Sequence, residues 1–163
     1  MEKYIPVTEA ARLVDRVTQS SAQPPLLTGD FYPGAYGPTI ILSISSVEAC
    51  AWLQGAFREL ARSGAPRKLA AEPEVRLANI HGLEMIRRST GPRVSLSRRR
   101  DEADADFVWA ATADGWLYLA DLIQSFCDGG SGHHYLTENT DDAALIELSF
   151  GEDDVPDVEF HTP

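Results

Sequence analysis

The fold is decided by the stretch TIILSISSVEACAWLQGAFREL, residues 39–60. Residues 39–44 are largely β-branched and alternate in polarity, which is typical of a strand with one buried face. The next four residues, 45–48, have the pattern of a capping box that begins a helix. Apolar side chains then recur at helical spacing, at Cys50, Leu53, Phe57 and Leu60. The stretch therefore predicts a strand that passes directly into an amphipathic helix over residues 46–63.

From residue 74 the apolar period becomes two, which predicts strands. The alternating segments are residues 74–85, with a break at Gly82, and residues 93–98 and 106–111. Because short turns join them, we expect an antiparallel meander. Two further strands are predicted over residues 133–137 and 144–150.

Two more helices are predicted, over residues 7–19 and 115–127, the second capped by Asp114. Residues 20–38 collect prolines and glycines and are interpreted as an ordered loop. The 163 residues have the size of one domain. We therefore expect a single α+β domain over residues 1–163, with a mainly antiparallel sheet of five or more strands covered by about three helices.

Charge is distributed unevenly along the chain. The net charge is -11, and all 14 Lys and Arg residues lie at or before Arg100. Residues 101–163 carry sixteen acidic side chains and no Lys or Arg. This imbalance argues against nucleic-acid binding, because phosphate would be repelled, and it favours a basic protein partner. The alternative is that the two halves neutralise each other in one fold and the excess serves solubility.

Compartment and redox state can also be predicted. No apolar run approaches the length of a membrane span, and the N-terminus lacks a basic stretch followed by an apolar one, so we expect a cytoplasmic protein without a membrane anchor. Cys50 and Cys127 are the only cysteines. We interpret both as free, buried thiols that form neither a disulfide framework nor a zinc site.

The motifs favour no catalytic residue, cofactor or metal. Gly129–Gly132 follows a helix C-terminus, so it is interpreted as a turn rather than a phosphate loop. His133 and His134 are adjacent in a predicted strand and would point to opposite faces, which disfavours a shared metal ion. No Gly-x-Ser-x-Gly element is present. We therefore expect a binding protein and not an enzyme.

A candidate partner-binding surface follows from the same region. A tyrosine anchors an interface at low entropic cost, and flanking carboxylates can steer a basic partner and bind its arginines. The predicted partner-binding residues are Tyr135, Asp141, Asp142, Glu152, Asp153 and Asp154. The alternative is a purely structural role, in which Tyr135 packs on the sheet with solvated acids around it. The competing functions are a small-ligand-binding protein or enzyme near residues 133–135, with His134, Tyr135 and Glu147 converging, and a subunit that self-associates.

The C-terminal third also resembles a known family. The helix from Trp116, the segment GHHYL at residues 132–136, the acidic pair Asp141-Asp142 and the strand IELSFGE at residues 146–152 form the pattern. It is similar to the C-terminal signature of small actinobacterial proteins that include immunity protein 32 of polymorphic-toxin systems. The likeness covers about a quarter of the chain, and residues 1–100 have no part in it. It implies a cytosolic protein that binds and blocks a toxin domain, with no catalytic residue.

Overall fold

The computed structural model describes residues 25–34, 37–99, 105–137 and 144–151. These residues form an α+β fold, which confirms the predicted class. The strands are β1 (Leu27–Gly34), β2 (Gly37–Ile44), β3 (Arg67–Lys68), β4 (Val75–Ala78), β5 (Gly82–Arg87), β6 (Val94–Arg98), β7 (Asp106–Ala111), β8 (Gly132–Tyr135) and β9 (Leu145–Phe150). The helices are α2 (Val47–Ser63), α3 (Ala113–Leu122) and α4 (Gln124–Cys127), with a 3-10 turn, η1 (Leu69–Ala71). The helix predicted over residues 7–19 lies outside the described residues.

The strand-to-helix transition at β2–α2 is confirmed. Ser46 is the N-cap, and its hydroxyl accepts a hydrogen bond from the Ala49 N–H at 3.1 Å. The helix ends at Gly64, whose φ of 69° is left-handed and suits glycine. Arg87 of β5 donates to the Ala61 carbonyl at 2.8 Å, so a guanidinium satisfies an orphan acceptor in the last turn.

The third predicted helix begins two residues earlier than expected and is divided. Thr112, not Asp114, is the N-cap, because its backbone is extended and its hydroxyl accepts from the Gly115 N–H at 3.1 Å. The helical pattern breaks at Ile123, which separates α3 from α4. Trp116, Ala120 and Ile123 recur at helical spacing along this segment, and all three are fully buried.

The predicted meander is wrong, because the strands divide between two mixed sheets. The five-stranded sheet has the order β4-β1-β2-β9-β8, and the four-stranded sheet has the order β3-β5-β7-β6. β4 pairs in parallel with β1, whereas β5 pairs in parallel with β7. Asn79, with a left-handed φ of 56°, lies between β4 and β5 and redirects the chain from one sheet to the other.

The segment interpreted as a loop contains a strand that the sequence analysis missed. β1 pairs antiparallel with β2 along its whole length, from Leu27 opposite Ile44 to Gly34 opposite Gly37. A side chain at Gly29 would approach the Leu77 methyl within 2.7 Å, so glycine lets β4 and β1 pack closely here.

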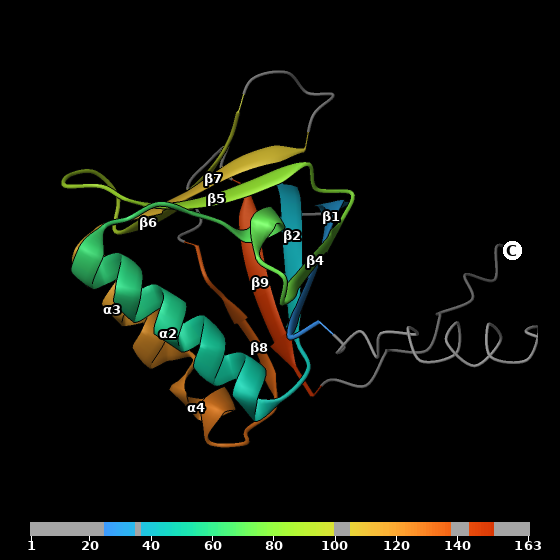
Figure 1. The fold of residues 1–163 in the computed structure, drawn as a ribbon. Helices are drawn as coiled ribbons and strands as arrows, with labels where there is room; N and C mark the ends of the chain where they lie inside the picture. The colour runs from blue at the N-terminus through green and yellow to red at the C-terminus, as the bar shows by residue number, and fades with distance from the viewer. Residues whose placement is uncertain (1–24, 35–36, 100–104, 138–143, 152–163) are drawn as a thin grey trace, which may run out of the picture.

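Both sheets and the helices share one hydrophobic core (Figure 1). The four-stranded sheet lies across the top of that view, and the helices lie beneath it and beside β8 and β9. Phe57 of α2, Trp109 of β7 and Trp116 of α3 form its aromatic centre, with ring centroids 5.3–5.6 Å apart. The Trp116 indole N–H donates to the Ile86 carbonyl at 3.2 Å, which ties α3 to the four-stranded sheet. None of the described helices combines the length and hydropathy that a membrane span needs.

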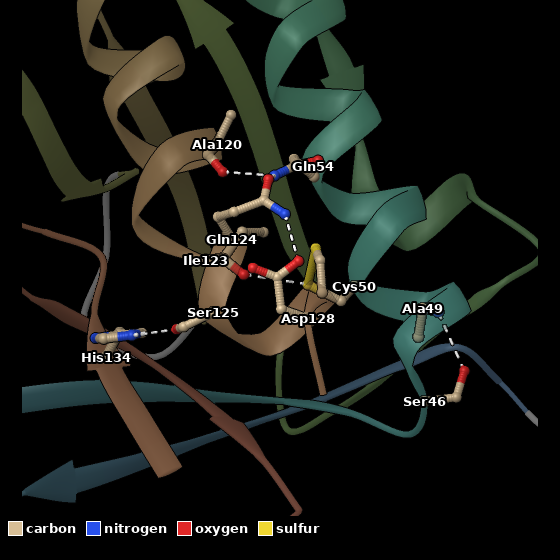
Figure 2. The surroundings of a disulfide bond; sticks show 11 residues. Ser46, Ala49, Cys50, Gln54, Ala120, Ile123, Gln124, Ser125, Asp128 and His134 are labelled. Carbon is tan, nitrogen blue, oxygen red and sulfur yellow. Dashed lines mark hydrogen bonds between the residues drawn. A yellow bond between two sulfur atoms is a disulfide. The ribbon is translucent and has the colours of Figure 1, made fainter. Parts of the chain in front are cut away.

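The interpretation of Cys50 and Cys127 as free thiols is wrong, because the two form a disulfide between α2 and α4. Helix packing brings their Cα atoms to 5.3 Å, an ordinary separation for a bridge. One turn along α2, the Gln54 amide donates to the Ala120 carbonyl and the Gln124 side-chain oxygen, each at 2.8 Å (Figure 2). A covalent bond and a buried polar contact therefore hold the helices together.

Candidate functional site

A small pocket at the end of β8 contains the one predicted partner-binding residue that the structure describes. Tyr135 is 54% exposed. The pocket has a volume of about 80 Å³ and is lined by Arg93, Val94, Tyr118, Tyr135, Leu136 and Thr137. We call it the Arg93 pocket. It brings together three segments of the chain: the residue before β6, helix α3, and the end of β8.

Hydrogen bonds to β9 position the β8 side of the pocket. The Leu136 N–H donates to the Ile146 carbonyl at 2.7 Å, and the Ile146 N–H donates to the Thr137 hydroxyl at 3.1 Å. Tyr135 lies opposite Glu147 on β9. Since neighbouring strand residues alternate in direction, Leu136 is buried while Tyr135 projects outward.

Close backbone packing positions the Arg93 side. The Thr112 N–H donates to the Arg93 carbonyl at 3.1 Å. A side chain at Gly115 would collide with that same carbonyl oxygen, so only glycine permits this approach. Tyr118 follows almost one turn later on α3, and the Arg93 guanidinium lies over its ring, 3.8 Å from the centroid. This is a close cation–π contact on a half-exposed ring.

Exposed acids follow one another along α3 and at the end of α4. Asp114 and Asp121 are about two helical turns apart on α3 and share a face, and exposed Asp128 is the C-cap that follows α4. Leu117 is 46% exposed between the first two of them. The described residues 105–137 contain no Lys or Arg, so no basic side chain of that segment neutralises the face.

Most of the predicted surface falls outside the described residues. Asp141, Asp142, Glu152, Asp153 and Asp154 all do. The described residues carry ten Lys and Arg and eleven Asp and Glu, so they are almost neutral. The remaining segments therefore hold nearly all of the net charge of -11.

The sequence analysis missed Arg93, Tyr118 and Leu117. A signal was present for the last two, because Leu117 and Tyr118 are large side chains that lie off the buried stripe of their helix. No local pattern marks Arg93, whose role depends on a contact with α3.

The alternative site does not assemble. His134 lies on the face opposite to Tyr135, where its ring packs 4.8 Å from Phe126 and its Nε2 lies 3.5 Å from the Ser125 hydroxyl. Tyr135 and Glu147 are cross-strand neighbours, but His134 points to the helices. The three side chains therefore do not converge on one cleft.

A larger cavity, of about 310 Å³, lies at the edge of the four-stranded sheet. Its ionisable lining residues are Lys68, His81, Glu84, Arg99 and Asp106. Arg99 and Glu84 form an ion pair, which neutralises part of the charge that lines this cavity. The lining contains no Ser, Thr or Cys that could act as a nucleophile. Within the described ranges, no three His, Cys, Asp or Glu side chains gather as a metal site.

Among the acids in the described ranges, two carboxyl groups have shifted pKa values, and both lie on α2 outside the two cavities. The hydrogen bond with its own backbone N–H, helped by the Ser46 hydroxyl, lowers the pKa of the Glu48 carboxyl. The hydrogen bond from Arg62 lowers the pKa of Glu59. These shifts reflect a helix terminus and a surface ion pair, respectively.

Comparisons with family models, curated proteins and solved structures found no match. The likeness of the C-terminal third to immunity protein 32 therefore stays an expectation from the sequence.

Proposed function

We propose that this protein is a protein-binding domain that acts as a bacterial immunity protein, neutralising a basic toxin domain in the cytoplasm. The observation that carries the proposal is the exposure of Tyr135 beside Tyr118 and Arg93 in one pocket. Tyrosine and arginine are the residue types, with tryptophan, that contribute most of the binding energy in protein interfaces.

The arrangement of these side chains suits an interface. Stacking on Tyr118 restricts the Arg93 guanidinium before any partner arrives, which lowers the entropy lost on binding. Exposed Leu117 extends the apolar surface along α3. The buried side chains of Val94 and Leu136 support the pocket from below and make it rigid.

Charge supports the choice of a basic partner. Asp114 and Asp121 are exposed on α3, Asp128 is exposed directly after α4, and the C-terminal sixty-three residues contain no Lys or Arg. Such a surface accelerates encounter with a cation-rich protein and repels acidic competitors. The resemblance to immunity protein 32 supports a toxin as that partner.

A protection assay tests the proposal. The protein encoded next to this one on the chromosome is divided into domains, and its C-terminal domain is expressed in a bacterial host with and without this chain. We expect growth only when both are present, and we expect the two to copurify. Tyr135→Ala should weaken protection, whereas Tyr32→Ala, which alters an exposed tyrosine on β1, should not. Loss of toxicity without a complex, or equal protection by the Tyr135 variant, would contradict the proposal.

A further inference from the structure

The Arg93 guanidinium lies against an aromatic ring in the Arg93 pocket. It is stacked 3.8 Å above the Tyr118 ring centroid. Stacking occupies the flat face of the group and leaves its in-plane N–H donors available for a carboxylate. The ion pairs between described residues are Arg62–Glu59, Arg67–Glu72 and Arg99–Glu84, and Arg93 takes part in none of them.

The remaining lining of the pocket suits the side chain of an acidic amino acid. Val94 and Leu136, 2% and 1% exposed, provide apolar contacts for methylene groups. Tyr118 and Tyr135 supply phenol hydroxyls that can donate to an oxygen anion. A volume of about 80 Å³ limits the occupant to one small side chain.

The surroundings give this cation a particular role. The exposed face of α3 is acidic, with Asp114 and Asp121, so a carboxylate of an approaching protein would be repelled along most of it. Arg93 is the one basic residue among those that line the pocket, and Asp114 precedes Tyr118 by one helical turn. A partner carboxylate is therefore accepted at one point only, which would set the register of the complex.

We propose that the Arg93 pocket binds the carboxylate of a single Asp or Glu side chain of the protein partner. The proposal rests on the proposed function for the identity of the partner. Binding of a carboxylate to the pocket does not require the toxin and can be measured on this chain alone.

The first experiment uses a small probe on the full chain. N-acetylglutamate N-methylamide, which carries one carboxylate, is titrated while NMR signals of the Arg93 Nε–H and of the Leu136 and Thr137 amides are recorded. N-acetylglutamine N-methylamide is the neutral control. We expect saturable shifts with the glutamate probe and none with the glutamine probe. Equal responses to both probes would overturn the proposal.

Matched variants identify the group responsible. Arg93→Gln should reduce the apparent affinity for the probe about tenfold or more, the range for loss of a charged hydrogen bond. Arg93→Lys should retain part of the response, since it keeps the charge without the planar fork. Arg76→Gln removes an exposed arginine from β4, at the opposite edge of the five-stranded sheet, and should leave the affinity unchanged. An Arg76 effect as large as that of Arg93 would show nonspecific electrostatics and overturn the proposal.

The chain's own acids are a necessary control, because Glu138, Asp141 and Asp142 follow Thr137 closely in sequence. If the wild type fails to bind the probe and the triple Asn/Gln variant binds it, a carboxylate of this chain occupies the pocket and the proposal is overturned. Probe binding by the wild type supports it.

A double-mutant cycle with the toxin domain connects the pocket to the partner. Each Asp and Glu of that domain is changed to Asn or Gln. We expect one position where the substitution weakens binding about tenfold or more and where Arg93→Gln adds little further loss. A complex that forms normally without any coupled acid would leave the proposed function standing and overturn this inference.

Discussion

Cys50 and Cys127 join α2 to α4 by a disulfide that spans 77 residues of sequence. Cys50 is fully buried, and its sulfur lies 3.4 Å from the Ile123 carbonyl oxygen. Because α4 has only four residues, it cannot be stable by its own hydrogen bonds. The bridge and Phe126, which packs on His134 and Phe150, hold α4 against the five-stranded sheet.

Removing the bridge should lower stability. The double variant Cys50→Ala, Cys127→Ala should lose about 2–4 kcal/mol of unfolding free energy relative to the oxidised protein, as typical disulfides contribute. Urea unfolding with and without a thiol reductant measures it. The wild type should lose stability in reductant and the variant should not, so identical wild-type curves would show that the bridge is absent or inert.

The redox state in cells bears on the proposed compartment. Disulfides are rare in the cytosol, where thiols are kept reduced. In a cytoplasmic protein, the reduced Cys50 thiol would have the Ile123 carbonyl as a hydrogen-bond acceptor. Arresting cells in acid and then alkylating the denatured protein should therefore modify both cysteines, since Cys50 is too buried to react in the folded state. Complete protection from the reagent would contradict the cytoplasmic placement.

Substitution of Gly115, which packs against the Arg93 backbone, should destabilise the protein. Gly115→Ala forces a methyl group against the Arg93 carbonyl, so we expect a loss of about 1–3 kcal/mol through overpacking. Gly55→Ala on α2 is the matched control, because no atom lies within 4 Å of its added methyl group. That control should gain up to about 1 kcal/mol from helix propensity. Urea unfolding measures the unfolding free energy of both variants. A change of the same sign in both would contradict the prediction.

Truncating the aromatic anchors should affect dissociation more than association. Tyr135→Ala should cost about 1–3 kcal/mol of binding free energy, expressed mainly in the dissociation rate, because a packed contact is lost. Surface plasmon resonance with the toxin domain measures both rates. An unchanged dissociation rate would place the interface elsewhere.

Neutralising the acids should instead slow association. One variant changes Asp114, Asp121 and Asp128 to Asn, and a second changes Asp141, Asp142, Asp153 and Asp154. Each should associate several-fold more slowly at low salt and much less so at high salt, since fields are screened beyond about 8 Å at physiological ionic strength. A control that is charge-matched to the first variant changes Glu48, Glu59 and Glu74 to Gln. Equal effects of the control would mean that net charge acts without a defined surface.

Metal removal should have no effect on folding. The described residues gather no cluster of three ligands, and the sequence offers no usable ligand spacing. The melting temperature with and without a chelator tests this, and a fall of many degrees on chelation would refute it.

Local sequence patterns were enough to predict several individual strands and helices. The residues of β2, α2, β6 and β7 were predicted almost to their ends, because alternation and helical spacing depend on which side of each element faces the core. Tyr135 could be singled out from the sequence because it is an aromatic residue next to an acidic segment.

Strand pairing and contacts between distant residues depend on packing, so they appear only in the folded structure. Strand partners are chosen by packing between segments, so no local pattern shows that β5 pairs with β7 while β4 pairs with β1. No local pattern shows the pairing of β1 either. Its Gly29 leaves space for the Leu77 methyl group, which a side chain at that position would meet. Helix packing brings Cys50 close to Cys127. Gly115 on α3 leaves room for the Arg93 carbonyl, and the Arg93 guanidinium lies over the Tyr118 ring. These contacts join residues far apart in sequence, and their free energy comes from burial that exists only once the sheets and helices have packed.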